Sequence, residues 1–262
     1  MKKQFLPLML LSTALCACSG NQQSDSEPMI TKTEIQVKDG QFTPEIMHQL
    51  GKVSDVQVSP DHSKILYGVT YTSIEQNKGN RELYLMNVDG SDNVKLTNTP
   101  KSESNARWMN NSQIIYMRSG KLYTATLEGS ALKNETEVAG AEGMESFELS
   151  PAGDKLMFIK SIKAAQKPTD IYPDLDKSSG RTYDDLMYRH WDHFVEEVPH
   201  TYVANFDGKQ VNGIVDILAG DKANPETETK KFELPTLPFG GLEQLSWSPD
   251  GKYIAYSCRK LA

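Results

Sequence analysis

A short pattern of two apolar runs joined by a Ser-Pro turn recurs along this chain, and it restricts the fold more than any other feature of the sequence. Full copies lie at 56–67, 147–158 and 245–256, and a copy with a shorter turn lies at 106–116. Proline and small polar residues form tight turns, and apolar residues that alternate with polar ones form half-buried strands. Each copy therefore predicts a β-hairpin with one face in the core.

The spacing of the copies indicates a repeat architecture. The equivalent positions, Val58, Trp108, Leu149 and Trp247, are 50, 41 and 98 residues apart, and second hairpins with Asp-Gly or Glu-Gly turns follow three of the copies. A unit of about 40 to 50 residues with four strands has the size of a propeller blade, and the two tryptophans at equivalent positions are expected in its core. We therefore expect an all-β chain, an incomplete β-propeller of about three and a half four-stranded blades at 53–100, 104–142, 145–220 and 243–262.

The third unit contains a long insert. Its second strand is expected to end near Ile162 and its third strand to begin near Thr201, which makes 163–199 the insert. Residues 163–180 are polar and rich in turn-forming residues. Apolar or aromatic residues at intervals of four from 186 to 198 predict a helix over 184–198 that Pro199 ends. The expected fold is thus a propeller with a helical insert in the third blade, and long loops in compact domains often carry function.

The N-terminus has the pattern of a bacterial export and lipidation signal. Lys2 and Lys3 precede an apolar stretch at 5–15, which is too short to span a bilayer and typical of a signal peptide. The sequence around Ala17 resembles a lipobox with lipidation at Cys18, because Cys16 would have bulky Leu15 before it. Ordinary cleavage after Ala17 is the alternative. We expect a signal peptide at 1–18, a polar tether at 19–41, and a periplasmic or outer-membrane lipoprotein of a Gram-negative bacterium.

Composition excludes some classes of partner. The net charge is -7, from 28 Lys and Arg against 35 Asp and Glu, so a nucleic-acid partner is not expected. If Cys16 is removed and Cys18 is lipidated, Cys258 is left alone and no internal disulfide can form. Because Cys258 ends an apolar strand-like run, it is expected to be a buried, unreactive thiol.

The repeats resemble the WD40-like repeats of TolB-type propellers, and the insert narrows the resemblance. The insert closely resembles the N-terminal propeller of the prolyl oligopeptidase family, in particular that of the dipeptidyl-peptidase V and acylaminoacyl-peptidase-like enzymes of Bacteroidetes-type bacteria. The residues that carry this resemblance are 167–177, 180–181, 185–188, 190–192, 195–196 and 199–200. Segments 42–45, 50–54 and 81–83 are also similar to that family. The resemblance implies an exported serine peptidase whose propeller gates and anchors peptide substrates, with a homodimer as the form of the full-length enzyme.

The catalytic domain of that family is not expected within these residues. The family carries a C-terminal α/β-hydrolase domain with a Ser-Asp-His triad, whose serine lies in a G-x-S-x-G turn. No serine here has glycine both two residues before it and two residues after it. The sequence ends at Ala262, just after the first hairpin of the fourth unit. We expect an N-terminal fragment or interrupted reading frame without catalytic residues, inactive alone. The alternatives are a non-enzymatic TolB-like propeller that acts as a binding module of the cell envelope, and a purely structural lipoprotein fragment.

The insert supplies the candidate substrate-binding residues, Glu196 and Glu197. In related dipeptidyl peptidases, a glutamate pair on a short propeller helix binds the N-terminal ammonium of the substrate, and residues 191–198 look similar to that segment. Two carboxylates facing one cavity would pair with this charge, with Glu196 favoured over Glu197. The alternative is a solvated acidic turn.

Metal sites are not expected in the insert. His190, His193 and Glu197 have the spacing of ligands on one helix face, but no H-E-x-x-H pattern is present. Residues 174–180 faintly resemble a calcium loop with its glycine one position late. Ordinary packing is favoured for both segments, and no cofactor is expected.

Overall fold

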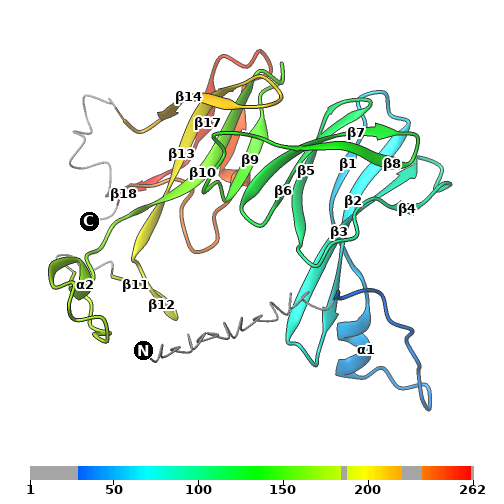
Figure 1. The fold of residues 1–262 in the computed structure, drawn as a ribbon, viewed down its shortest axis with the longest axis horizontal. Helices are drawn as coiled ribbons and strands as arrows, with labels where there is room; N and C mark the ends of the chain where they lie inside the picture. Colours follow the sequence, from blue (N-terminus) through cyan, green and yellow to red (C-terminus); the bar gives the residue numbers. More distant parts are fainter. Residues whose placement is uncertain (1–28, 184–187, 220–231, 261–262) are drawn as a thin grey trace, which may run out of the picture.

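The computed structural model describes residues 29–183, 188–219 and 232–260. The predicted signal peptide, the lipidation site Cys18 and Leu186 of the predicted helix lie outside the described residues. The described chain is predominantly β, and Figure 1 shows its sheets following one another in chain order.

Three antiparallel sheets have four strands each, which confirms the predicted four-stranded units. The first sheet has the order β1 (Lys52–Val58), β2 (Lys64–Ser73), β3 (Lys78–Asn87), β4 (Val94–Lys95). The second has the order β5 (Glu103–Asn110), β6 (Gln113–Arg118), β7 (Lys121–Glu128), β8 (Ala131–Glu137). The third has the order β9 (Ser146–Leu149), β10 (Lys155–Lys163), β13 (Glu197–Phe206), β14 (Val211–Asp216).

Shorter elements complete the described fold. Three two-stranded pairs are β11 (Arg189–His190) with β12 (His193–Phe194), β15 (Phe232–Glu233) with β18 (Arg259–Lys260), and β16 (Leu245–Trp247) with β17 (Ile254–Tyr256). The described helices are α1 (Pro44–Gln49), α2 (Pro168–Ile171) and the 3-10 turn η2 (Leu242–Gln244).

The serine of each Ser-Pro turn explains why the repeat folds as a hairpin. Its hydroxyl accepts a hydrogen bond from the amide five residues later, at 2.9 Å for Ser59, 3.1 Å for Ser150 and 2.9 Å for Ser248. The same hydroxyl donates to an aspartate within the turn, at 2.6 to 2.9 Å. The fourth turn residue has positive φ in the three full copies, which suits Gly153 and Gly251, whereas the first copy has His62 there. The Ser-Pro motif therefore recurs because its serine and aspartate make the local hydrogen bonds that close the hairpin turn.

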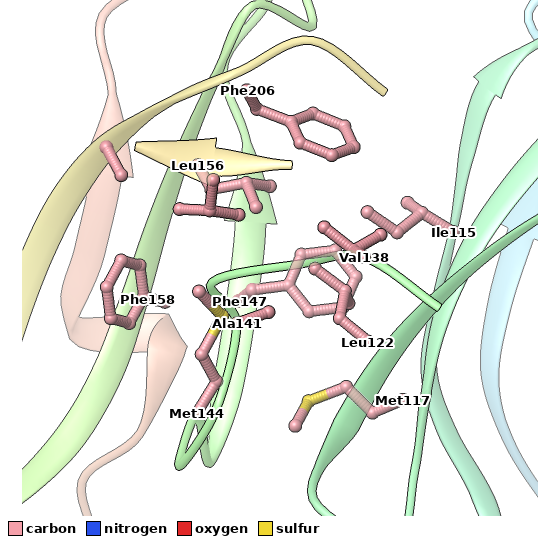
Figure 2. Packing of buried hydrophobic residues seen from close by; sticks show 12 residues of the cluster. Ile115, Met117, Leu122, Val138, Ala141, Met144, Phe147, Leu156, Phe158 and Phe206 are labelled. Atoms are coloured by element: carbon pink, nitrogen blue, oxygen red, sulfur yellow. The ribbon is translucent and has the colours of Figure 1, made fainter. Parts of the chain in front are cut away.

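The hydrophobic core lies between successive sheets. One cluster joins the first and second sheets and includes Leu66, Leu83 and Ile114, with Trp108 packed against it. A second cluster joins the second and third sheets; Figure 2 shows Ile115 and Leu122 facing Phe147 and Leu156. A third joins the third sheet to the β15 and β16 segments, and Trp247 packs against it. Both tryptophans thus pack against core clusters, as predicted, but each is only partly buried.

The first strands of the three sheets are also joined directly by polar side chains. Trp108 of β5 donates its indole N–H to the carbonyl of Gln57 in β1 at 3.3 Å. Asn105, at the other end of β5, donates its amide to the carbonyl of Phe147 in β9 at 2.6 Å. The strands β1, β5 and β9 therefore follow one another at neighbouring positions.

Two expectations are corrected. The helix predicted over 184–198 is wrong for the described residues 188–198, which form the β11–β12 hairpin and the start of β13. Val198 pairs with Ile162 of β10, so β13 begins earlier than predicted, and this pairing with a distant strand overrides the local pattern. The described insert contains one helical turn, α2. Cys258 is exposed rather than buried, because β17 ends at Tyr256 and the chain turns away from that sheet.

Candidate functional site

The insert leaves the third sheet at the point where β10 and β13 stop pairing. Lys163 lies opposite Glu197 at the last pair of this ladder, and the insert extends from there, away from the sheet (Figure 1). An open pocket of about 220 Å³ lies within the insert, and polar residues line it: Lys167, Thr169, Ser178, Ser179, Gly180, Arg181 and Glu196.

Glu196 is the centre of this pocket. Its carboxylate accepts hydrogen bonds from Lys167 Nζ at 2.7 Å and from Arg181 Nε at 2.5 Å. These two bonds, the one from Lys167 first, hold the pKa of Glu196 below its ordinary value. The carbonyl of Glu196 also accepts from the amides of Ala164 and Ala165, at 3.0 and 3.2 Å. Glu196 therefore joins both ends of the insert, and its charge is already paired with two cations.

Glu197 is placed differently. It is the first residue of β13 and is exposed, and it does not line the pocket that Glu196 lines. Successive side chains of a strand point to opposite faces. The binding of a substrate ammonium by either glutamate stays a prediction.

The two histidines of the insert have separate partners. His190 is buried, and its Nε2 lies 2.9 Å from Glu233 Oε1, whereas His193 lies 3.1 Å from the neighbouring Asp192. Glu197, which has ligand spacing to both histidines in the sequence, lies in β13 and makes neither contact. His190, His193 and Glu197 therefore do not share one set of contacts in the structure.

A buried charge cluster that the sequence analysis missed fixes the insert against the C-terminal segment. Glu233 is fully buried; one carboxylate oxygen faces His190, and the other accepts from Arg259. Arg259 Nη2 also donates to the carbonyl of Leu237 at 3.0 Å. His190 and Arg259 are 43 and 26 residues from Glu233 in sequence. The one available signal was an acidic residue between Phe232 and Leu234, since a carboxylate in an apolar strand needs partners.

Beside this cluster, two aromatic side chains meet at the surface. Trp191 lies in the turn between β11 and β12, and Phe239 lies in the segment that follows β15. Their ring centroids are 4.8 Å apart with an interplanar angle of 75°, an edge-to-face contact. They remain 72% and 75% exposed, respectively.

A second open cavity, of about 370 Å³, lies between the third sheet and the β16–β17 hairpin. Its apolar and aromatic lining residues are Val203 of β13, Ile217 directly after β14, and Trp247, Tyr253, Ile254 and Tyr256. Within the described residues, no helix has the length and apolar character that crossing a membrane requires.

The chain is similar to known proteins both in amino-acid sequence and in structure. No family model matches the chain. The chain is 36% identical over 222 residues to dipeptidyl-peptidase 5 of Porphyromonas gingivalis, which covers 84% of this chain and 31% of that protein. It is 30% identical over 265 residues to dipeptidyl-peptidase 5 of Porphyromonas endodontalis, which covers 99% of this chain and 36% of that protein. The chain thus spans about a third of the length of these relatives.

Among solved structures, the chain is similar to acylaminoacyl peptidase of Pyrococcus horikoshii, with 17% identity and a TM-score of 0.47 over 65% of this chain and 25% of that one. It is also similar to the AtxE2 isopeptidase, with 12% identity and a TM-score of 0.41 over 74% of this chain and 36% of that one.

Proposed function

This chain is homologous to dipeptidyl-peptidase 5 over most of its length, and from that premise we propose that it is the N-terminal β-propeller portion of an exported serine peptidase of this type. In this proposal the chain anchors and gates peptides for a hydrolase domain that lies outside these residues. The observation that carries the proposal is the 36% identity over 222 residues with a dipeptidyl-peptidase 5.

The arrangement of the sheets supports a propeller. Each of the three four-stranded sheets is an antiparallel meander in chain order, apart from the insert in the third. Their first strands β1, β5 and β9 are neighbours, as the innermost strands of consecutive blades are. In this proposal the β16–β17 hairpin begins a fourth blade, because Trp247 packs against the third sheet as Trp108 packs against the first.

The insert pocket supports a role in holding the substrate. A peptide ammonium has the charge of the Lys167 ammonium that now contacts Glu196, and the Lys167 side chain is 49% exposed. The ammonium of a peptide can therefore replace that of Lys167 on the same carboxylate, and the displaced Lys167 ammonium, already half exposed, is then hydrated by water. Glu197, which follows Glu196 in the chain and is exposed at the start of β13, is the second carboxylate of the proposed site.

The N-terminal segment adds a location to the proposal. Lipidation of Cys18 would hold the protein at a bacterial membrane by a polar tether, in the periplasm or at the outer membrane. Metabolic labelling with a palmitate analogue tests this point: wild-type protein incorporates the label and a Cys18→Ser variant does not. Equal labelling of both proteins would contradict it.

A chimera tests the peptidase proposal. The matching segment of the Porphyromonas gingivalis dipeptidyl-peptidase 5 is replaced by the corresponding residues of this chain, and release of dipeptides from a free-amine chromogenic substrate is measured. We expect dipeptidyl-peptidase activity, because the two segments are homologous over 222 residues. The controls are the same relative with the segment deleted and this chain alone, neither of which is expected to cleave the substrate.

The outcome separates the proposal from its alternative. A chimera that melts cooperatively but releases no dipeptide would contradict the peptidase proposal. It would favour a non-enzymatic binding module of the envelope instead.

A further inference from the structure

The backbone of Trp191 adopts a conformation that does not suit its side chain. Trp191 and Asp192 form a two-residue loop, since His190 pairs with His193 across the β11–β12 hairpin. Trp191 has φ of 46° and Asp192 is not among the residues with positive φ. Positive φ at the first loop position alone is the pattern of a type II′ turn, which favours glycine there. A large aromatic residue at this position is strained, and strain of this kind is concentrated at functional sites.

Folding buries little of the apolar surface of the Trp191 side chain, so burial does not offset the backbone strain. It is 72% exposed, and Phe239, its one aromatic neighbour, is 75% exposed. Within these residues both rings therefore keep most of their apolar surface exposed, and a ligand that covers it gains hydrophobic contact. Neither burial in the core nor turn geometry accounts for a tryptophan at this place.

The two rings are nevertheless held in fixed positions. The hairpin that carries Trp191 is anchored by the buried contact between His190 and Glu233 at 2.9 Å. The segment that carries Phe239 is anchored by Arg259, which bonds to both Glu233 and the Leu237 carbonyl. One buried carboxylate thus positions both rings, and rings that are already in place lose little conformational entropy when a ligand binds.

We propose that Trp191 and Phe239 form a binding site for an apolar side chain of a peptide. The ligand class rests on the proposed function, and the contact chemistry comes from the rings. Two rings at 75° form a corner that covers an aliphatic or aromatic side chain on two sides. The net charge of -7 disfavours the other common ligand of exposed aromatic pairs, a single-stranded nucleic acid.

Tryptophan fluorescence of the full chain tests the site. The chain has three tryptophans, and Trp247 lines the cavity beside the third sheet, so the emission is measured in the wild-type chain and in Trp191→Gly. The part of the response that Trp191→Gly loses is assigned to Trp191. The probes are Ala-Phe-Ala amide and, as a matched control with the same charge and length, Ala-Ser-Ala amide. We expect a saturable blue shift of the emission with the first peptide and none with the second. Equal responses to both peptides, or no saturable response to either, would overturn the proposal.

Variants separate binding from a structural role. Trp191→Gly removes both the ring and the strain, so we expect an unchanged or higher Tm together with loss of peptide binding measured by calorimetry. Phe239→Ala is expected to weaken binding about tenfold or more at unchanged Tm, since burying a large aromatic side chain contributes that much. The control Phe42→Ala removes another exposed ring, 67% exposed, and is expected to bind normally.

Other outcomes contradict the inference in distinct ways. A lower Tm of Trp191→Gly with normal peptide binding would make Trp191 a structural residue. Concentration-dependent association of the chain that Phe239→Ala abolishes, without peptide binding, would make the pair a contact between two copies. Failure of peptide binding with an active chimera would overturn this inference alone, whereas an inactive chimera with intact peptide binding would overturn the peptidase proposal alone.

Discussion

Arg107 of β5 forms an ion pair with Asp55 of β1 that joins the first and second sheets, with 2.7 Å between Nη1 and Oδ1. Asp55 has φ of 55° at an irregularity of the β1–β2 ladder, and Arg81 Nη2 lies 3.5 Å from its other oxygen. Two arginines from different strands therefore fix one carboxylate at the junction of the sheets.

We expect Arg107→Ala to lower the free energy of unfolding by about 1–2 kcal/mol, because it removes a charged hydrogen bond that is mostly shielded from water. Urea denaturation measures this change. Lys121→Ala is the matched control: its pair with Glu137 has a similar length of 2.9 Å, but the side chains are 53% and 44% exposed, so a much smaller loss of stability is expected. Equal losses in the two variants would contradict the role of Arg107.

Phe147 is fully buried between the second and third sheets, where it faces Ile115 and Leu122 (Figure 2). Phe147→Ala removes a large side chain from a close-packed cluster and is expected to cost about 3–5 kcal/mol of stability. The measurement is again urea denaturation. Phe42→Ala, at a 67% exposed position, is expected to change stability by less than about 0.5 kcal/mol. A similar midpoint for both variants would show that the sheets do not pack through this cluster.

Glu103 of β5 is fully buried beside a second carboxylate, Glu82. Burial raises the pKa of Glu103 to about 7 from an ordinary value of 4.5; hydrogen bonds from Thr99 and Thr97 and the charge of Arg118 oppose this shift, while Glu82 adds to it. The folded protein thus favours the protonated carboxyl. The contribution of the Glu103 carboxyl to the free energy of unfolding is therefore complete below about pH 4.5 and is lost as the pH rises toward 7.

Glu103→Gln should abolish this part of the pH dependence. Relative to the variant, the wild-type protein is expected to lose stability between pH 4.5 and 7, by up to about 3 kcal/mol. Denaturation of both proteins across this range, and the difference between the two curves, measures it, because all other titrating groups are common to both. A flat difference curve would contradict a raised pKa at Glu103.

Glu196 has a structural and a proposed binding role, and these roles predict different results. Glu196→Gln weakens the pairing with Lys167 and Arg181, so limited proteolysis of the insert is expected to be faster. In the chimera, the same variant is expected to raise KM for free-amine substrates by about tenfold, because a charged pair with the ammonium is lost. N-blocked substrates are expected to be unaffected.

The control is Arg181→Met, which removes one cation from Glu196 but keeps the carboxylate. It is expected to accelerate proteolysis without the selective rise in KM. If Glu196→Gln affects free and blocked substrates equally, the ammonium-binding role is rejected and the structural role remains.

The insert shows where sequence patterns fail. The spacing of His190, Phe194 and Val198 fits a helix, but the structure buries His190 and Val198 and leaves Phe194 39% exposed. His190 is held by Glu233, 43 residues later, and Val198 by Ile162 on β10. Cys258 likewise follows an apolar run yet is exposed, because β17 pairs with β16 alone among the described strands.

The hairpins follow from local sequence alone. Their turns depend on bonds between residues at most five apart, such as Ser59 with Asp61 and Lys64, and these form wherever the residues occur. The alternating apolar residues on either side then decide which face is buried, so the four-stranded units could be predicted without coordinates.

The contacts between charged and aromatic side chains, in contrast, depend on long-range packing. These contacts join residues more than twenty positions apart in sequence: Glu233 with His190 and Arg259, Arg107 with Asp55, and Trp191 with Phe239. No local rule selects such partners, because each contact depends on how whole sheets and the insert pack. A buried charge is stable only when that packing delivers its counter-charge.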